Sequence, residues 1–166
     1  MKDEINTFAD YKALVKEYEE TDSVSRRESI KEAIRSKAEE LLHELIALYA
    51  KYGRDYVEDD DYREDRGWLS LAEFDEDKAC MNYSDRWKYG GECYFGIEVP
   101  MKYLDDDEMT ALEKKLREEH MSYIQVKRDA LKRLKKAAEE LKTEIEELDA
   151  EIKELEMKLE AMNKGE

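Results

Sequence analysis

Residues 124–162 read IQVKRDALKRLKKAAEELKTEIEELDAEIKELEMKLEAM, and this stretch decides the fold. Its apolar residues recur in alternating steps of three and four, which is the heptad spacing of a coiled coil. The a positions are Ile124, Leu131, Ala138, Ile145, Ile152 and Leu159, and the d positions are Leu134, Leu141, Leu148, Leu155 and Met162. Lys127 alone interrupts this stripe. The pattern predicts a helix whose apolar face needs a partner.

The same helix is expected to begin well before the heptads. From Asp105 to Met162 the chain contains no proline and no glycine, and most of its residues are strong helix formers. We expect Asp105 to cap the helix, with Glu108 near the positive end of the helix dipole and Leu104 packed on Met109 as a hydrophobic staple. Such a helix would be roughly 85 Å long.

Two shorter amphipathic helices are predicted before it. The first lies within residues 1–20, with Thr7 as its N-cap. Ser25 and Glu28 have the spacing of a capping box, so the second helix is expected to start there and to stop near Gly53. Its apolar positions form a second heptad pattern: Ile34, Ala38, Leu41, Leu45, Leu48 and Tyr52.

Between the second helix and the long C-terminal helix, short extended runs are separated by acidic or glycine-containing turns. They predict strands over 68–74, 79–89 and 92–99. A three-residue turn, Gly90 to Glu92, would gather apolar residues on one face of the last hairpin. The expected partners are Trp87 with Phe95, Asp85 with Ile97, Tyr83 with Val99, and Met81 with Met101. This register also separates Cys80 from Cys93, so two reduced thiols are expected.

The predicted fold is therefore α+β and mainly α: an antiparallel helical pair with a small antiparallel β-sheet inserted at one end, and a long C-terminal coiled-coil helix. Residues 1–53 hold the two N-terminal helices, 54–104 the acidic and aromatic β insertion, and 105–166 the long helix with its arm. They make one structural domain plus an arm. From their lengths, the second helix should cover the third as far as about Leu134.

Composition excludes several classes of function. Asp and Glu number 45 against 29 Lys and Arg, and the net charge of −16 argues against direct binding of nucleic acid. The chain has no long apolar run and its first residues, MKDEINTF, do not resemble a signal peptide, so we expect no membrane contact and a cytoplasmic protein. Two cysteines are too few for a disulfide scaffold.

The residues for catalysis or metal binding are not arranged in recognisable patterns. His43 and His120 lack a carboxylate or cysteine at metal-ligand spacing, and no P-loop, dinucleotide fingerprint or GxSxG elbow occurs. The acidic run after Val57 does not fit an EF-hand, which leaves either a solvated loop or a weak divalent-ion site. We expect a protein that is not an enzyme and has no cofactor.

Negative charge is concentrated in residues 54–108, which contain 18 Asp and Glu but only 7 Lys and Arg. Aromatic residues are interleaved with these carboxylates, so the region could bind a basic surface of another protein. Alternatively, the aromatics form a small core and the carboxylates keep it soluble. The candidate partner-binding residues are Glu58, Asp59, Asp60, Asp61, Tyr62, Asp65, Trp68, Tyr89 and Tyr94.

The arm offers a second interaction surface, and a homodimer through the C-terminal helix is expected. Its oligomerisation residues are Ala138, Leu141, Ile145, Leu148, Ile152, Leu155 and Leu159. A parallel pair would oppose Glu144 with Asp149, whereas an antiparallel pair would bring Lys142 towards Asp149, so the antiparallel arrangement is favoured. A helix from another protein and a solvated arm remain alternatives.

The phrase GGECYFGIEVPMKYLDDDE, which runs into a charged helix, resembles small uncharacterised bacteriophage accessory proteins over residues 68–125. The resemblance implies a protein of the kind that includes inhibitors of bacterial defence systems, such as anti-CRISPR proteins, acting in the host cytoplasm. Our first hypothesis is a non-enzymatic acidic interaction protein that occludes a basic or nucleic-acid-binding surface. The second is a coiled-coil adaptor or assembly protein with a structural β cap. A hydrolase or small-molecule pocket between sheet and helices is the third.

Overall fold

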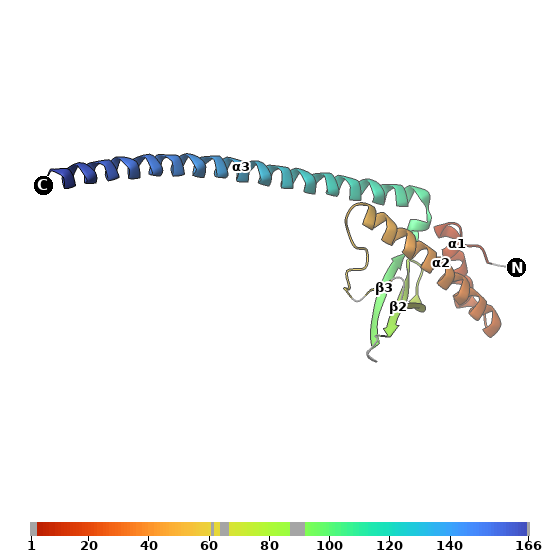
Figure 1. The fold of residues 1–166 in the computed structure, drawn as a ribbon. Coiled ribbons are helices and arrows are strands. Elements are labelled where there is room, and N and C mark those ends of the chain that lie inside the picture. Colours follow the sequence, from red (N-terminus) through yellow and green to blue (C-terminus); the bar gives the residue numbers. More distant parts are fainter. Residues whose placement is uncertain (1–2, 61, 64–66, 87–91, 166) are drawn as a thin grey trace. The chain divides into compact units, whose positions relative to one another are not determined.

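The computed structural model describes residues 3–60, 62–63, 67–86 and 92–165, and of residues 86 and 92–94 it describes the backbone alone. The elements follow in this order: α1 (Phe8–Glu20), α2 (Val24–Lys51), β1 (Trp68–Phe74), β2 (Lys78–Arg86), β3 (Glu92–Pro100), the 3₁₀-helix η1 (Met101–Leu104) and α3 (Asp106–Lys164). The predicted class is confirmed, because a small antiparallel sheet is inserted into a mainly helical chain that ends in one long helix (Figure 1). The chain forms two compact units, residues 1–120 and 121–166, and α3 contributes to both.

The starts of the first two helices are set by side-chain caps. Thr7 caps α1 as predicted, and its hydroxyl takes part in a complete capping box. The predicted box of Ser25 and Glu28 is wrong, because Ser23 caps α2 and accepts a 3.3 Å hydrogen bond from the backbone N–H of Arg26. Arg26 therefore occupies the position of the reciprocal carboxylate, and α2 begins two residues earlier than expected.

Helix α2 ends at a glycine, as predicted. Gly53 adopts φ 68°, a left-handed conformation that glycine reaches without a steric penalty. The backbone N–H of Gly53 donates to Ala50 O and that of Arg54 donates to Tyr49 O, both at 3.0 Å. These two bonds make a Schellman motif, which satisfies carbonyls that the end of a helix would otherwise leave unpaired.

The three strands form one antiparallel sheet in the order β1-β2-β3, and their predicted positions are confirmed except for 87–89, which lie outside the described residues. The predicted hairpin register is wrong: Tyr83 pairs with Phe95 instead of Val99, and Met81 pairs with Ile97 instead of Met101. The last described pair of this hairpin is Arg86 with Glu92. The connection between them, with the expected pairing of Trp87, lies outside the described residues.

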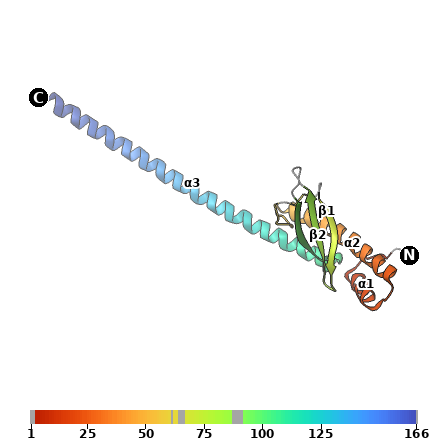
Figure 2. The same ribbon diagram turned by 90° about the horizontal axis from the view of Figure 1, so that it is seen from below.

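The core of residues 1–120 lies where α2 crosses one face of the sheet (Figures 1 and 2). The predicted apolar positions Ile34, Ala38, Leu41 and Leu45 of α2 are all buried, and Leu48 is partly buried. From the sheet, Ala79, Met81, Tyr83, Ile97 and Val99 face them. Leu112 and Leu116 are the buried residues of α3.

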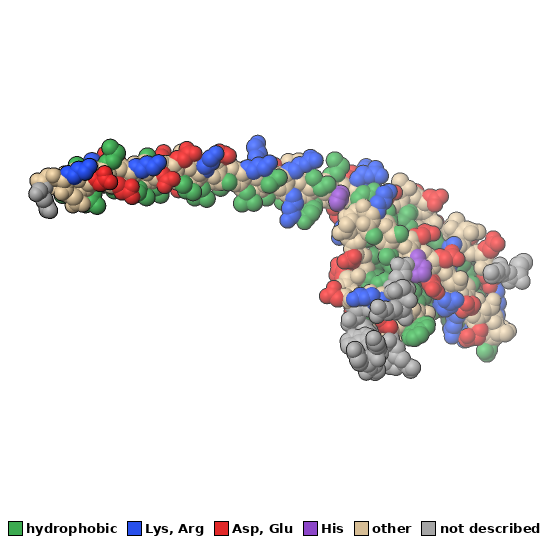
Figure 3. All heavy atoms as spheres, in the orientation of Figure 1, with side chains coloured by type: hydrophobic (Ala, Val, Ile, Leu, Met, Phe, Trp, Pro, Cys, Tyr) green, Lys and Arg blue, Asp and Glu red, His purple; other side chains and the backbone are tan. Residues whose placement is uncertain are grey.

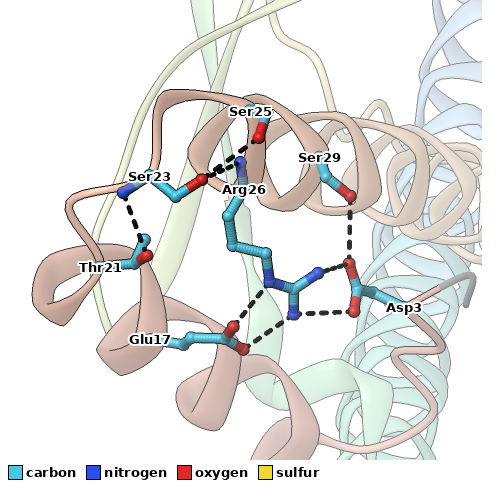
Figure 4. Close-up of polar contacts among 7 residues, drawn as sticks. All are labelled: Asp3, Glu17, Thr21, Ser23, Ser25, Arg26 and Ser29. Atoms are coloured by element: carbon cyan, nitrogen blue, oxygen red, sulfur yellow. Dashed lines mark hydrogen bonds and ion pairs between the residues drawn. The ribbon is translucent and has the colours of Figure 1, made fainter.

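An antiparallel helical pair is present, but α1 and α2 form it. The guanidinium of Arg26 bridges the carboxylates of Glu17 and Asp3, with N–O distances of 2.6 and 2.7 Å (Figure 4). These contacts hold α1 and the segment before it against the start of α2. The two helices therefore fold back on each other across a short turn.

The expected antiparallel packing of α2 on α3 is wrong. Lys51 contacts Glu113, and Arg54, three residues later, contacts Glu119, six residues later. Residue numbers therefore increase in the same direction along the end of α2 and the start of α3, so the two run in the same direction. The predicted cover as far as Leu134 is also wrong, because Leu116 is the last buried residue of α3 and Leu134 is 68% exposed. The physical reason is that the apolar face of α2 packs on the sheet.

Candidate interaction surfaces

An exposed apolar stripe runs along α3 in residues 121–166. Six of the predicted oligomerisation residues expose between 51% and 59% of their surface: Leu141, Ile145, Leu148, Ile152, Leu155 and Leu159. The seventh, Ala138, is exposed as well. Figure 3 shows hydrophobic side chains along one edge of this part of the helix and most charged side chains along the other. The stripe is the predicted heptad seam, and it lacks a covering partner among the described residues.

Charge pairs within the arm do not account for this stripe. Lys158 lies 2.9 Å from Glu154 and Lys136 lies 3.9 Å from Glu140, and both pairs are largely exposed to solvent. Exposed pairs of this type contribute about 0.3–0.5 kcal/mol each to a helix. They support helix formation, but they give no reason for leucine or isoleucine at every a and d position from Leu141 to Leu159.

The beginning of α3 is fixed by a polar cluster around Glu113. Its carboxylate accepts hydrogen bonds from Lys51 Nζ at 2.7 Å and from the Tyr52 hydroxyl at 2.9 Å. The hydrogen bond from Lys51 is the main reason that the pKa of Glu113 lies below its usual value. Sequence reasoning missed this cluster, because its members are about sixty residues apart and share no local spacing. It anchors the first turns of α3 to the end of α2.

The aromatic residues of the acidic region mostly support the core. The ring of Tyr62 packs 4.9 Å from that of Tyr83 and 6.4 Å from that of Phe95. The hydroxyl of Tyr83 accepts a 2.9 Å bond from Arg63 N and donates a 3.0 Å bond to Arg63 O. Tyr56 donates to the carbonyl of Glu98 at 2.6 Å. This arrangement favours the structural interpretation of these aromatics over the partner-binding one.

The other described candidates for partner binding lie in two separate places. Glu58, Asp59 and Asp60 are exposed, and the first two line a shallow hollow of about 380 Å³ beside β3. Trp68 is 61% exposed on β1, at the opposite edge of the sheet. Three further candidates, Asp61, Asp65 and Tyr89, lie outside the described residues, as does the side chain of Tyr94.

Groups suited to metal or redox chemistry are not gathered in the described part of the chain. Within those residues, no group of three or more His, Cys, Asp or Glu side chains is placed to hold a metal ion. His120 packs its ring 6.1 Å from that of Tyr52. Cys80 is a free thiol paired in register with Glu98, and burial raises its pKa. No described helix is both long and apolar enough to span a membrane.

Comparison of the chain with protein-family models, curated proteins and solved structures gives no match. A functional assignment must therefore come from the residues themselves. Of the two candidate surfaces, the stripe on α3 is continuous and lies on a single element, whereas Glu58 and Asp59 lie beside β3 and Trp68 lies on β1, at the other edge of the sheet. The stripe is the stronger candidate site.

Proposed function

We propose that this chain is a non-enzymatic assembly protein whose C-terminal arm, residues 121–166, self-associates as a coiled coil and carries the folded unit of residues 1–120. One observation carries the proposal: a heptad stripe of Leu and Ile that leaves more than half of each side chain in contact with water. Isolated surface apolar residues are common, but an aligned stripe over several heptads indicates an interaction site.

The energies favour association of the stripe. Because full burial of a Leu or Ile side chain stabilises a protein by about 1.5–3 kcal/mol, covering the half-exposed stripe contributes on the order of 10 kcal/mol per chain. Two chains together then exceed the roughly 4–15 kcal/mol that association costs. A solvated arm forgoes this stabilisation, so it is the less favourable alternative.

Truncation after Ala138 tests this proposal. The truncated chain keeps the core and the Glu113 cluster but loses most of the stripe. Light scattering coupled to size-exclusion chromatography should give a dimer mass for the full chain and a monomer mass for the truncated one. Truncation after Met162 keeps the stripe and is the matched control. A full chain that remains monomeric when its concentration is raised 100-fold would refute self-association.

The acidic region supports a second candidate function, a phage-type inhibitor that occludes a basic surface of a defence effector. The exposed indole of Trp68 favours it, because large exposed aromatics are enriched at protein interfaces. Binding should weaken steeply with salt and after reversal of Asp59, Asp60 and Asp61 to lysine, and it should survive truncation after Ala138. Salt-independent binding through the arm would exclude this function.

A further inference from the structure

The charges beside the stripe change sign along the arm. At the e positions of the heptad, which lie at the edge of a coiled-coil interface, Arg128, Lys135 and Lys142 are followed by Asp149 and Glu156. The first half of this row is basic and the second half is acidic. Such a row is complementary to a copy of itself that runs in the opposite direction.

A parallel pair makes no use of this complementarity. In a parallel coiled coil, each g position faces the e position of the next heptad in the partner. Glu144 then faces Asp149 of the second copy, and Glu151 faces Glu156, each twice by symmetry. The basic e residues Lys135 and Lys142 face Ala130 and Ala137. Parallel pairing therefore has like-charge contacts and no compensating ion pair.

An antiparallel pair brings opposite charges together, because e positions then face e positions. With Ile145 layered on Leu148 of a second copy, Lys142 faces Asp149 and Lys135 faces Glu156, each twice by symmetry. Glu144 still approaches Glu151, so the favourable contacts outnumber the unfavourable ones. Building on the proposed function, we infer that the arm's occupant is a second copy of this chain in antiparallel orientation.

The apolar layers select this register. It places Leu131 on Met162, Ala138 on Leu155 and Ile152 on Leu141, so every layer between residues 131 and 162 is apolar. A shift by one heptad in one direction would instead insert Lys127 opposite Leu159, and a shift in the other direction would bring the Asp149 residues of the two copies together. The twofold axis lies between residues 146 and 147, which separates the His120 residues of the two copies by about 80 Å at 1.5 Å per residue.

Charge reversal in the full chain tests the orientation. Lys135→Glu with Lys142→Glu turns the favourable e contacts of the antiparallel pair into repulsive ones, and it should raise the dimer dissociation constant at least about tenfold. The matched control is Lys132→Glu with Lys153→Glu, which changes the net charge equally at b positions that face away from the interface. The control dimer should dissociate like the unaltered chain. Equal dissociation constants for both variants would overturn the antiparallel inference.

Spin-label distances provide a second measurement that does not depend on stability. In a Cys80→Ser, Cys93→Ser background, labels at Thr143→Cys should lie about 10 Å apart along the axis, and labels at Asp129→Cys about 50 Å apart. Similar short distances at both sites would establish a parallel pair and overturn this inference, while leaving the proposed self-association intact. A monomer would instead overturn the proposed function, and with it this inference.

Discussion

The carboxylate of Asp105 accepts a 2.9 Å hydrogen bond from the backbone N–H of Phe8, although the two residues are 97 positions apart. The carbonyl of Asp105 accepts the first bond of α3, from Met109 N at 3.1 Å. One residue therefore starts α3 with its backbone and satisfies the start of α1 with its side chain. This explains how the first helix is fixed to the helix that bears the arm.

Replacing Asp105 by alanine should lower the free energy of unfolding by about 1 kcal/mol, the usual net contribution of an intramolecular hydrogen bond. The matched control is Asp107→Ala, because Asp107 is exposed in the first turn of α3 and has only the helix dipole to lose. Urea unfolding followed by far-ultraviolet circular dichroism measures both. Equal losses for the two variants would show that the bond to Phe8 contributes nothing.

Tyr11 should contribute to the stability of the fold through its hydroxyl as well as through its ring. The side chain is fully buried, and its hydroxyl donates to Asp75 O at 2.6 Å and contacts Lys78 O at 3.0 Å. Tyr11→Phe should destabilise the fold by about 1 kcal/mol, the usual net contribution of an intramolecular hydrogen bond. Tyr123→Phe, at a tyrosine that is 60% exposed, should leave the unfolding free energy unchanged.

Gly67 should not tolerate a side chain. A Cβ built there would lie 1.8 Å from Cε2 of Tyr83, the residue whose hydroxyl accepts a hydrogen bond from Arg63 N. Gly67→Ala should therefore destabilise the fold by about 1–3 kcal/mol through overpacking. Gly96→Ala is the control, because its Cβ would meet nothing nearer than Met81 O at 4.0 Å. If both alanine variants unfold at the same urea concentration, the contact with Tyr83 is unimportant.

The Arg26 cluster predicts a dependence of stability on pH. Hydrogen bonds from Arg26 hold the pKa of Asp3 and that of Glu17 below their usual values. Their contribution is therefore complete above the unfolded pKa, near 4, and is lost as the pH falls through the lower folded values. Arg26→Ala should lower the melting temperature at pH 7 by more than Lys16→Ala, whose pair with Glu20 is largely exposed.

The difference in melting temperature between the unaltered chain and Arg26→Ala should then shrink below pH 4. Differential scanning calorimetry from pH 3 to pH 7 would measure it. A difference that is constant over this range would mean that Arg26 acts through packing and not through its two carboxylates.

The hairpin shows which part of the fold could be predicted from sequence. Alternation of apolar and polar residues correctly placed Tyr83 and Phe95 on the same face of the sheet. Any register shifted by an even number of residues keeps the same faces, so alternation alone could not distinguish Val99 from Phe95 as the partner of Tyr83. The choice of a three-residue turn, Gly90 to Glu92, therefore gave the correct faces but the wrong partners.

Long-range packing explains the other differences. Heptad spacing correctly predicted that α2 and α3 each have an apolar stripe, but spacing does not reveal whether a stripe packs on a sheet, a helix or another chain. For α2 the partner is the sheet, and Leu116 is the last buried residue of α3. Likewise, the sequence could not show that Tyr62 packs beside Tyr83, because that contact depends on the path of a loop.

The most direct test of self-association compares two exposed hydrophobic residues of the arm. Leu148 lies on the stripe and is 57% exposed, whereas Met157 lies at an outward f position and is 70% exposed. Sedimentation equilibrium of the full chain should give a dimer mass for the unaltered protein and for Met157→Asp, and a monomer mass for Leu148→Asp. An unaltered chain that sediments as a monomer, or a dimer that Leu148→Asp leaves intact, would contradict the proposed coiled-coil assembly.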